Sequence, residues 1–359
     1  MRILLLKNPE KIVIAGDFGI VMEIDGRKTE LKGEVNLKFH PLVIWKGKKR
    51  VKNPRYPVRF SPIRGFVHLN GRAYRGEIVV KNVGGDVYVI NEVKMEDYLK
   101  GVVPLEMGYL REDLIEALKA QAVAARTYAV AHIRRNMPYD MVPTVEDQVY
   151  GGVRVESPLT NRAVEETRGV VAVYRGKPID AKYHSTCGGR TEDNENVWNG
   201  KPVPYLRSVR DSKRGKPFCR FSPHFNWVRV YSKEEFFSLI RKNLSEIIGE
   251  DPGRVRWVRI RKRTRSGRIK EVEVATAKKR YRIDKDRARR LFRDPKRGSL
   301  KSTLFHIETR GNKIYIKGRG FGHGVGMCQF GAMEMAREGY SYKQILKHYY
   351  RGIRLKKMW

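Results

Sequence analysis

The chain has 359 residues, of which 41% are hydrophobic and 32% are charged. This length suits one large domain or two to three smaller ones, and the hydrophobic share excludes a wholly disordered chain. Lys and Arg number 75 against 39 Asp and Glu, which gives a formal net charge of +36. Such an excess implies an anionic partner or surrounding, such as nucleic acid, a membrane surface or an anionic wall polymer.

Two function classes find little support in the sequence. No apolar run approaches the roughly 20 residues of a membrane span, so we expect no transmembrane segment. The apolar block at residues 3–6 is shorter than the roughly 7–15 residues of a secretory signal, so no export signal is visible. The basic residues recur along the whole chain, so a solvated basic surface explains them as well as an anionic partner does. They form no recognisable nucleic-acid-binding module.

The first half of the chain changes from strand to helix patterns. Residues 1 to about 95 hold short alternating apolar runs separated by turn residues, which predicts β-strands. The runs at 77–80 and 87–90 flank the turn 83–86 and predict a hairpin. Residues 113–136 lack Gly and Pro and predict a long helix, with Asp113 at its amino end and two arginines at its carboxyl end. Its apolar stripe consists of Leu114, Leu118, Ala122, Ala125 and Ala129.

The second half mixes short helices and strands. We expect a short helix at 160–167, a hairpin around 175–178, and a helix at 232–248 with a capping box of Ser232 and Glu235. Strands are expected at 255–260, 269–275 and 313–317. A glycine-rich loop and two short helices follow, the second capped by Ser341.

These patterns predict an α+β fold. Mostly antiparallel strands pack with a long central helix and several shorter helices, and an α/β satellite lobe is inserted. The expected domains are a β-rich region at 1–95, a core formed by 96–227 and 306–359, and a basic insert at 228–305.

Glu106 is the first candidate for chemistry. It lies in the mostly apolar run 102–107, where such surroundings raise the pKa of a carboxyl group and make it a suitable general acid. The alternative interpretation is a surface carboxylate between two elements.

The run 183–189 ends a predicted strand with small and polar residues, then Gly188 and Gly189 allow close approach of a ligand or backbone. Ser185 or Cys187 as a nucleophile with His184 as base is disfavoured, because adjacent strand residues point to opposite faces.

The run 318–332 holds six glycines around His323 and Gln329. It fits neither a Walker loop nor a dinucleotide-binding loop, and the glycine density favours a ligand-binding role over a structural connection. His184, Cys187, His323 and Cys328 would supply a zinc site if they converged. Polar packing, or a bridge between Cys187 and Cys219, is the favoured alternative.

Several runs together resemble the stage II sporulation protein D/LytB (SpoIID/LytB) family. They are residues 95–107, 117–128, 148–151 and 345–352 and the two glycine-containing runs, in the family's order over roughly residues 60–355. The resemblance implies a peptidoglycan lytic transglycosylase that cuts the β-1,4 bond between N-acetylmuramic acid and N-acetylglucosamine, with Glu106 as single acid and base. Denuded glycan strands are the implied substrate. Other members are described as amidase enhancers.

The resemblance also implies which residues line a substrate groove. It further indicates that a zinc site found in some members is not present here. The groove residues would be Arg126, Gln148, Tyr150, His184, Ser185, Gly188, Gly189, His323, Gly324 and Gln329. Some members carry zinc ligands in a loop that here, at 138–147, has neither His nor Cys, so we expect neither metal nor cofactor. The implied partners are peptidoglycan strands and other wall hydrolases such as amidases, at an extracytoplasmic location. The alternatives are a non-catalytic wall-binding or amidase-enhancing module and, from charge alone, a nucleic-acid binder.

Overall fold

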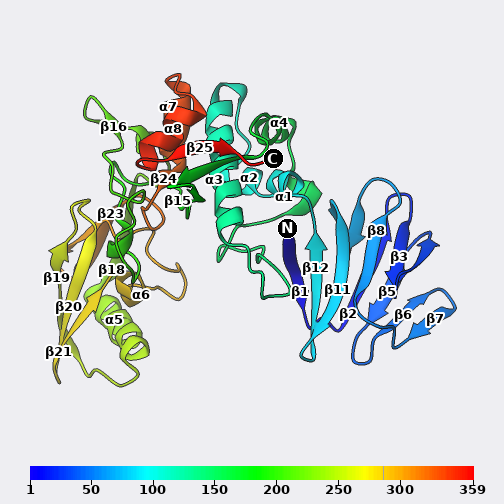
Figure 1. The fold of residues 1–359 in the computed structure, drawn as a ribbon. Helices are drawn as coiled ribbons and strands as arrows, with labels where there is room; N and C mark the ends of the chain where they lie inside the picture. The colour runs from blue at the N-terminus through cyan, green and yellow to red at the C-terminus, as the bar shows by residue number, and fades with distance from the viewer. Residues whose placement is uncertain (286) are drawn as a thin grey trace. The chain divides into compact units, whose positions relative to one another are not determined.

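The computed structural model of the protein describes residues 1–285 and 287–359 and has the expected α+β architecture (Figure 1). The chain forms two compact units. The first contains Met1–Val173, Lys177–Asp180 and Leu355–Trp359, and the second contains Tyr174–Gly176 and Ala181–Arg354. The three-part division expected from the sequence stays a prediction.

The first unit begins with two six-stranded antiparallel sheets, as the alternating runs predicted. One has the order β1-β12-β11-β8-β3-β4 and the other β10-β9-β2-β5-β6-β7. Alternate side chains such as Ile12, Ile14 and Phe60 are at most 1% exposed and form the core. The predicted hairpin is confirmed, with Val83 paired to Asp86. The strands are β1 (Arg2–Lys7), β2 (Lys11–Gly16), β3 (Ile20–Ile24), β4 (Arg27–Leu31), β5 (Val35–Lys38), β6 (Val43–Lys46), β7 (Lys49–Lys52), β8 (Val58–Pro62), β9 (Val67–Leu69), β10 (Arg72–Tyr74), β11 (Glu77–Val83) and β12 (Asp86–Glu92).

The helices of the first unit surround one buried helix, α3. Its bounds are Ile115–Ala131, preceded by a single 3₁₀ turn. The predicted helix is therefore confirmed, but the prediction that it runs to residue 136 is wrong. Arg134 lies beyond its end, where its guanidinium donates to Asp147 at 2.7 Å. The neighbouring elements are α1 (Met95–Lys100), α2 (Val103–Met107), α4 (Pro158–Glu166), and the sheet of β13 (Val170–Tyr174), β14 (Lys177–Pro178) and β25 (Arg354–Lys357).

Helix α3 is buried on almost every side rather than along one stripe. The five predicted stripe residues are buried, and so are the polar side chains of Gln121, Arg126 and Thr127. The reason is that α1, α2 and α4 all pack against it. The closing strand β25 had no counterpart in the sequence prediction.

The second unit contains a lobe with a hydrophobic core of its own. Sheets β18-β23-β22 and β19-β20-β21 pack with α5 (Lys233–Ile248) and α6 (Arg287–Leu291) around buried residues from Tyr231 to Ile316. The capping box of Ser232 and Glu235 is confirmed, and Gly249 ends the helix in a left-handed conformation (φ 77°). The strands of the lobe are β18 (Asn226–Ser232), β19 (Val255–Arg263), β20 (Ile269–Thr276), β21 (Arg280–Asp284), β22 (Phe305–Arg310) and β23 (Lys313–Arg319).

The remaining elements of the second unit are short. A two-residue strand, β15 (Tyr183–His184), pairs in parallel with β24 (Met327–Cys328), and α7 (Gln329–Arg337) follows directly. Helix α8 (Tyr342–Tyr349) carries the predicted cap at Ser341. The other elements are β16 (Ser212–Lys213), β17 (Lys216–Pro217) and the 3₁₀ turns at Asn194–Asn196 and Phe218–Phe221.

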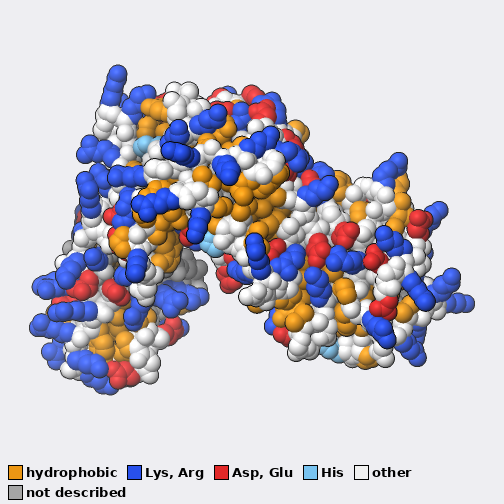
Figure 2. Space-filling view, viewed as in Figure 1, with side chains coloured by type: hydrophobic (Ala, Val, Ile, Leu, Met, Phe, Trp, Pro, Cys, Tyr) orange, Lys and Arg blue, Asp and Glu red, His pale blue; other side chains and the backbone are white. Residues whose placement is uncertain are grey.

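The surface matches the basic composition. Lys and Arg side chains are scattered over the visible surface of each unit among acidic ones (Figure 2). Among the described helices, none combines the length and the apolar character needed to cross a lipid bilayer.

Removing the cap of α5 tests its role in the lobe. The Ser232 hydroxyl accepts from the backbone N–H of Glu235 at 3.1 Å, so Ser232→Ala should lower the free energy of unfolding by about 1 kcal/mol. The control is Ser238→Ala on the exposed face of the same helix, where alanine is the better helix former and no loss is expected. Equal effects of the two variants in urea unfolding would contradict the assignment.

Candidate functional site

Glu106 lies on α2, a five-residue helix fixed at both ends. Pro104 stands in its first turn, and Gly108, with φ 74°, donates its N–H to the Pro104 carbonyl at 2.8 Å and ends the helix. Val103 and Met107 are buried, whereas Leu105 is 42% exposed and Glu106 is half-buried. The helix therefore fixes its backbone in the core and presents the carboxylate at the surface of the first unit.

A buried phenol lies near Glu106. The Tyr98 hydroxyl donates to Oε1 of Gln148 at 3.1 Å, and Nε2 of Gln148 donates to the carbonyl of Ala125 at 3.3 Å. Burial raises the pKa of Tyr98, and the charges of Asp147 and Glu106 raise it further. Tyr98 is therefore a permanent hydrogen-bond donor, and Gln148 joins the Glu106 region to the central helix.

Tyr150 packs against Tyr98, with the two ring centroids 5.2 Å apart. Its hydroxyl donates to Asn91 at 2.8 Å, and burial raises its pKa. Its ring lies against Gly101, where a Cβ atom would come within 2.5 Å of the ring. Gly101 is thus required for this close approach, and Tyr150 supports the site from within.

Arg126, expected in the groove, is fully buried in the first unit. Its guanidinium pairs with Glu96 at 2.5 Å and also donates to the carbonyls of Val164 and Val170. Burial lowers its pKa. In this structure Arg126 holds the fold together, and direct contact with a glycan stays a prediction.

In the second unit, the pairing of β15 with β24 brings the two glycine-containing runs together. Nδ1 of His184 lies 3.1 Å from the carbonyl of Val325, which fixes Nδ1 as the donor and leaves a lone pair on Nε2. Nε2 is buried, and no described residue makes a hydrogen bond with it. The His184 ring lies 5.4 Å from that of His323, which in turn lies 4.9 Å from Trp198.

His323 is held as a neutral side chain. Burial lowers its pKa to about 3, with a further contribution from Lys182. Nδ1 accepts from the backbone N–H of Val325 at 3.0 Å, so the ring proton lies on Nε2. His323 and Arg268 line a cavity of about 10 Å³, which is room for roughly one water molecule.

The other residues expected in this part of the groove shape the backbone around the histidines. Ser185 lies 3.2 Å from the Thr186 hydroxyl and makes no pair with His184, so the disfavoured nucleophile arrangement is not formed. Gly324 has φ 86°, and a Cβ there would lie 2.5 Å from the guanidinium carbon of Arg268. Gly188 and Gly189 also have positive φ, and Gln329 begins α7 as a buried residue. Their contacts with a substrate stay predictions.

The cysteines form neither the histidine-containing zinc set nor the Cys187–Cys219 bridge weighed from the sequence, and they show the polar packing that was the other alternative. Cys187, Cys219 and Cys328 are all free and buried, and the Sγ atoms of Cys187 and Cys219 lie 3.5 Å apart without a bridge. Neither His184 nor His323 joins them. Asp211, which no sequence pattern singled out, lies 2.9 Å from the Cys187 sulfur instead.

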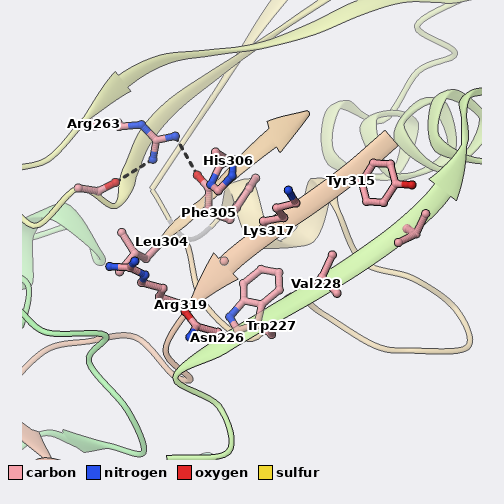
Figure 3. Close-up of a pocket in the computed structure, with 13 residues that line it drawn as sticks. Asn226, Trp227, Val228, Arg263, Leu304, Phe305, His306, Tyr315, Lys317 and Arg319 are labelled. Carbon is pink, nitrogen blue, oxygen red and sulfur yellow. Dashed lines mark hydrogen bonds between the residues drawn. The ribbon is translucent and has the colours of Figure 1, made fainter. Parts of the chain in front are cut away.

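The lobe contains a cavity of about 880 Å³ that sequence reasoning also missed (Figure 3). Trp227 and Phe305 supply aromatic walls, and Lys317 and Arg319 add positive charge. Arg263 is held at its edge by bonds to the carbonyls of Gly267 and Phe305, both at 2.8 Å. None of the residues predicted for the substrate groove lines this cavity, although Gly318 and Arg319 at its edge begin the glycine-rich run 318–332.

The structure is thus that of an α+β protein whose first unit presents Glu106 on a short helix and whose second unit holds His184 and His323 at a glycine-rich loop. Residues 83–174 match a family model described as stage II sporulation protein, and residues 219–326 match a domain of unknown function. The Glu106 helix and the Gln148 region lie inside the first match.

Relatives cover most of the chain. An uncharacterised protein of Brachyspira hyodysenteriae is 37% identical over 82% of this chain and 75% of its own length. The stage II sporulation protein D of Bacillus subtilis is 32% identical over 74% of this chain and 75% of its own length. The amidase enhancer of Bacillus subtilis is 33% identical over 72% of this chain, but the match spans 40% of its length. The chain belongs to the stage II sporulation protein D family, as the sequence motifs indicated.

Arg126→Met tests whether the buried ion pair is structural. The substitution leaves the Glu96 carboxylate buried without its cation, so we expect a loss of about 3–5 kcal/mol in the free energy of unfolding. Arg168→Met removes a pair with Glu165 in which the arginine side chain is 51% exposed, and should lower stability far less, because water and salt screen such surface pairs. Denaturant unfolding that ranks the two variants equally would contradict a structural role.

His323 should make stability fall with acidity. Its pKa is about 3 in the folded protein and 6.5 in its unperturbed form, so the unfolded state takes up the proton first. Its contribution is complete above pH 6.5 and is lost as the pH falls toward 3. Between pH of about 7 and about 5, wild type should therefore lose more stability than His323→Gln. Urea unfolding at a series of pH values measures this, and equal pH dependence of wild type and His323→Gln would contradict it.

Proposed function

We propose that the protein is a peptidoglycan lytic transglycosylase with Glu106 as its single acid and base. The observation that carries this proposal is the position of Glu106. It is a half-buried carboxylate on a rigid helix, near enough to Tyr98 to raise the pKa of that phenol, and inside the residues that match the sporulation family. A positioned carboxyl group beside polar donors is the minimum that proton transfer to a glycosidic oxygen requires.

The proposed reaction needs one carboxyl group. Protonated Glu106 donates its proton to the oxygen between N-acetylmuramic acid and N-acetylglucosamine, and the bond from that oxygen to the muramic C1 breaks. The C6 hydroxyl of the same muramic residue attacks C1, and its proton returns to the Glu106 carboxylate. The products are a free 4-hydroxyl end and a 1,6-anhydro ring, and no water is consumed.

The surroundings of Glu106 support a mechanism with a single carboxylate. Hydrolytic glycosidases use two carboxyl groups, the second to activate water or to attack the sugar. Asp147, the other acid whose charge acts on Tyr98, is occupied by Arg134 and by the backbone N–H of Val142. An intramolecular hydroxyl as the nucleophile removes the need for a second catalytic carboxylate.

We assign substrate binding in the second unit to neutral histidines. The buried Nε2 of His184 carries a lone pair that no described residue uses, so it can accept a hydrogen bond from a sugar hydroxyl or an N-acetyl N–H. Its pKa is lowered by burial and by nearby His323 and Arg268, so it acts as an acceptor at neutral pH. The net charge of +36 would hold the enzyme at an anionic wall, at an extracytoplasmic location.

A second candidate function rests on the likeness to the amidase enhancer. In that case the chain binds wall glycan and stimulates an amidase, and Glu106 contributes to binding at most. The chain spans 40% of that relative, which is why we rank this function second.

The substitution Glu106→Gln separates the two. It keeps the size of the side chain but removes the transferable proton, so release of anhydro-muramic ends should fall by at least about 100-fold while folding is retained. Mass spectrometry of products from denuded and intact sacculi measures it, because anhydro ends lack the mass of one water. Glu146→Gln changes an exposed glutamate in the same unit and should leave turnover unchanged. Normal turnover by Glu106→Gln would contradict the mechanism, and stimulation of an amidase with no anhydro ends from wild type would favour the second function.

A further inference from the structure

Four metal-ligating side chains meet in the interior of the second unit. Cys187 follows β15, Asp211 precedes β16, Cys219 lies in the 3₁₀ turn Phe218–Phe221, and Cys328 ends β24. All four side chains are 0% exposed. Their ligand atoms all lie within 4.8 Å of one another. Segments up to 141 residues apart are thus joined at one buried point.

The spacing of these atoms suits a tetrahedral ion. Zinc–sulfur bonds of about 2.3 Å place the sulfurs of a tetrahedral site about 3.8 Å apart. The Sγ atoms of Cys187 and Cys219 lie 3.5 Å apart, and Oδ2 of Asp211 lies 2.9 Å from the Cys187 sulfur. With a zinc–oxygen bond of about 2.0 Å the oxygen would lie about 3.5 Å from each sulfur, so separations longer by about 0.3 to 0.6 Å would open the centre to an ion.

Hydrogen-bond donors from the backbone and from side chains contact members of this cluster. Ligands in metal sites receive hydrogen bonds of the same kind. The N–H of Gly189 donates to the Cys187 sulfur at 3.2 Å, and that of Gly331 donates to the Cys328 sulfur at 3.4 Å. The Tyr349 hydroxyl donates to Oδ1 of Asp211 at 2.7 Å, which turns Oδ2 toward the thiols. Such second partners orient ligands and stabilise their charged forms.

Two basic side chains lie beside the cluster. Arg268, 1% exposed, donates to the carbonyl of Cys187 at 2.6 Å. Nε2 of His348 lies 3.4 Å from Oδ1 of Asp211. Oδ2 of Asp211 faces the thiols, and a divalent ion at the centre would balance the negative charge of this buried carboxylate and of the sulfur ligands.

We propose that Cys187, Cys219, Cys328 and Asp211 bind one Zn²⁺. Four protein ligands leave no open position, so the ion is structural and not catalytic. It would tie the start of α7 and the end of the glycine-rich loop to the segment after His184. This ligand set differs from the histidine–cysteine set considered in the sequence, and the inference is independent of the proposed function.

Metal content of the wild-type protein tests the proposal without any variant. After expression with zinc and extensive dialysis, elemental analysis should find about one zinc per chain. Denaturation with a chelator and no reductant should then expose all three thiols. Absence of metal after zinc addition would overturn the proposal, and so would a single titratable thiol, which would indicate a disulfide. A different metal at the same ratio would overturn zinc as the occupant.

Cobalt substitution identifies the ligands. Co²⁺ bound by thiolates gives sulfur-to-metal charge-transfer absorption, which should appear in wild type and weaken in Cys219→Ser. Asp211→Asn keeps all three thiols and should retain the sulfur bands with at least about 10-fold weaker affinity. Asp251→Asn, at an exposed pair with Arg241, should match wild type. Chelation should lower the Tm of wild type, and zinc should restore it. An unchanged cobalt spectrum in both cluster variants would contradict the assignment even if their stability fell.

Discussion

The ion pair between Arg126 and Glu96 is the contact on which the first unit depends. Arg126 projects from the middle of α3, and Glu96 from α1 also accepts from the backbone N–H of Gly169 and from Nε1 of Trp359 near the chain end. A charge buried this deeply is tolerated only with its partners in place. The pair therefore fixes α1 against α3, and with α1 it fixes Tyr98, whose hydroxyl donates to Gln148, which in turn donates to the Ala125 carbonyl of α3.

In the second unit, glycine has the corresponding role. The two-residue strands β15 and β24 give little pairing of their own, so the histidine loop depends on close backbone approaches. At Gly326 a Cβ atom would lie 2.0 Å from the Lys182 carbonyl, and at Gly331 it would lie 2.1 Å from the Tyr349 hydroxyl. The loop that carries His323 and the segment that carries Cys328 therefore both depend on glycines, because any side chain at these positions would clash with a neighbouring segment. The proposed zinc ion would cross-link these segments, which contain little regular secondary structure.

The proposed chemistry draws on features that each unit has by itself. The first unit presents a carboxylate on a short rigid helix, with a buried tyrosine as its neighbour. The second unit holds imidazoles that burial keeps neutral, which suits them to hydrogen bonding with uncharged groups and not to binding anions. The proposed reaction needs one carboxylate because the substrate supplies its own nucleophile, and the basic surface enters only the proposal that the protein is retained at an anionic wall.

The sequence alone determined the features that local forces decide. The hairpin at 83–86, the capped helices α5 and α8 and the glycine-rich loop are set by residues a few positions apart, and the family motifs were readable as short strings. Only the tertiary structure decided that α3 ends at Ala131, that residues 354–357 add a strand, and that Arg126 is buried against Glu96. It also decided that Asp211 meets three cysteines and that aromatic residues line a cavity in the lobe. These outcomes depend on contacts between distant segments, such as Arg126 with Glu96, 30 residues apart, and Cys187 with Cys328, 141 residues apart. No local pattern of residues encodes which distant partner will satisfy a buried charge or thiol.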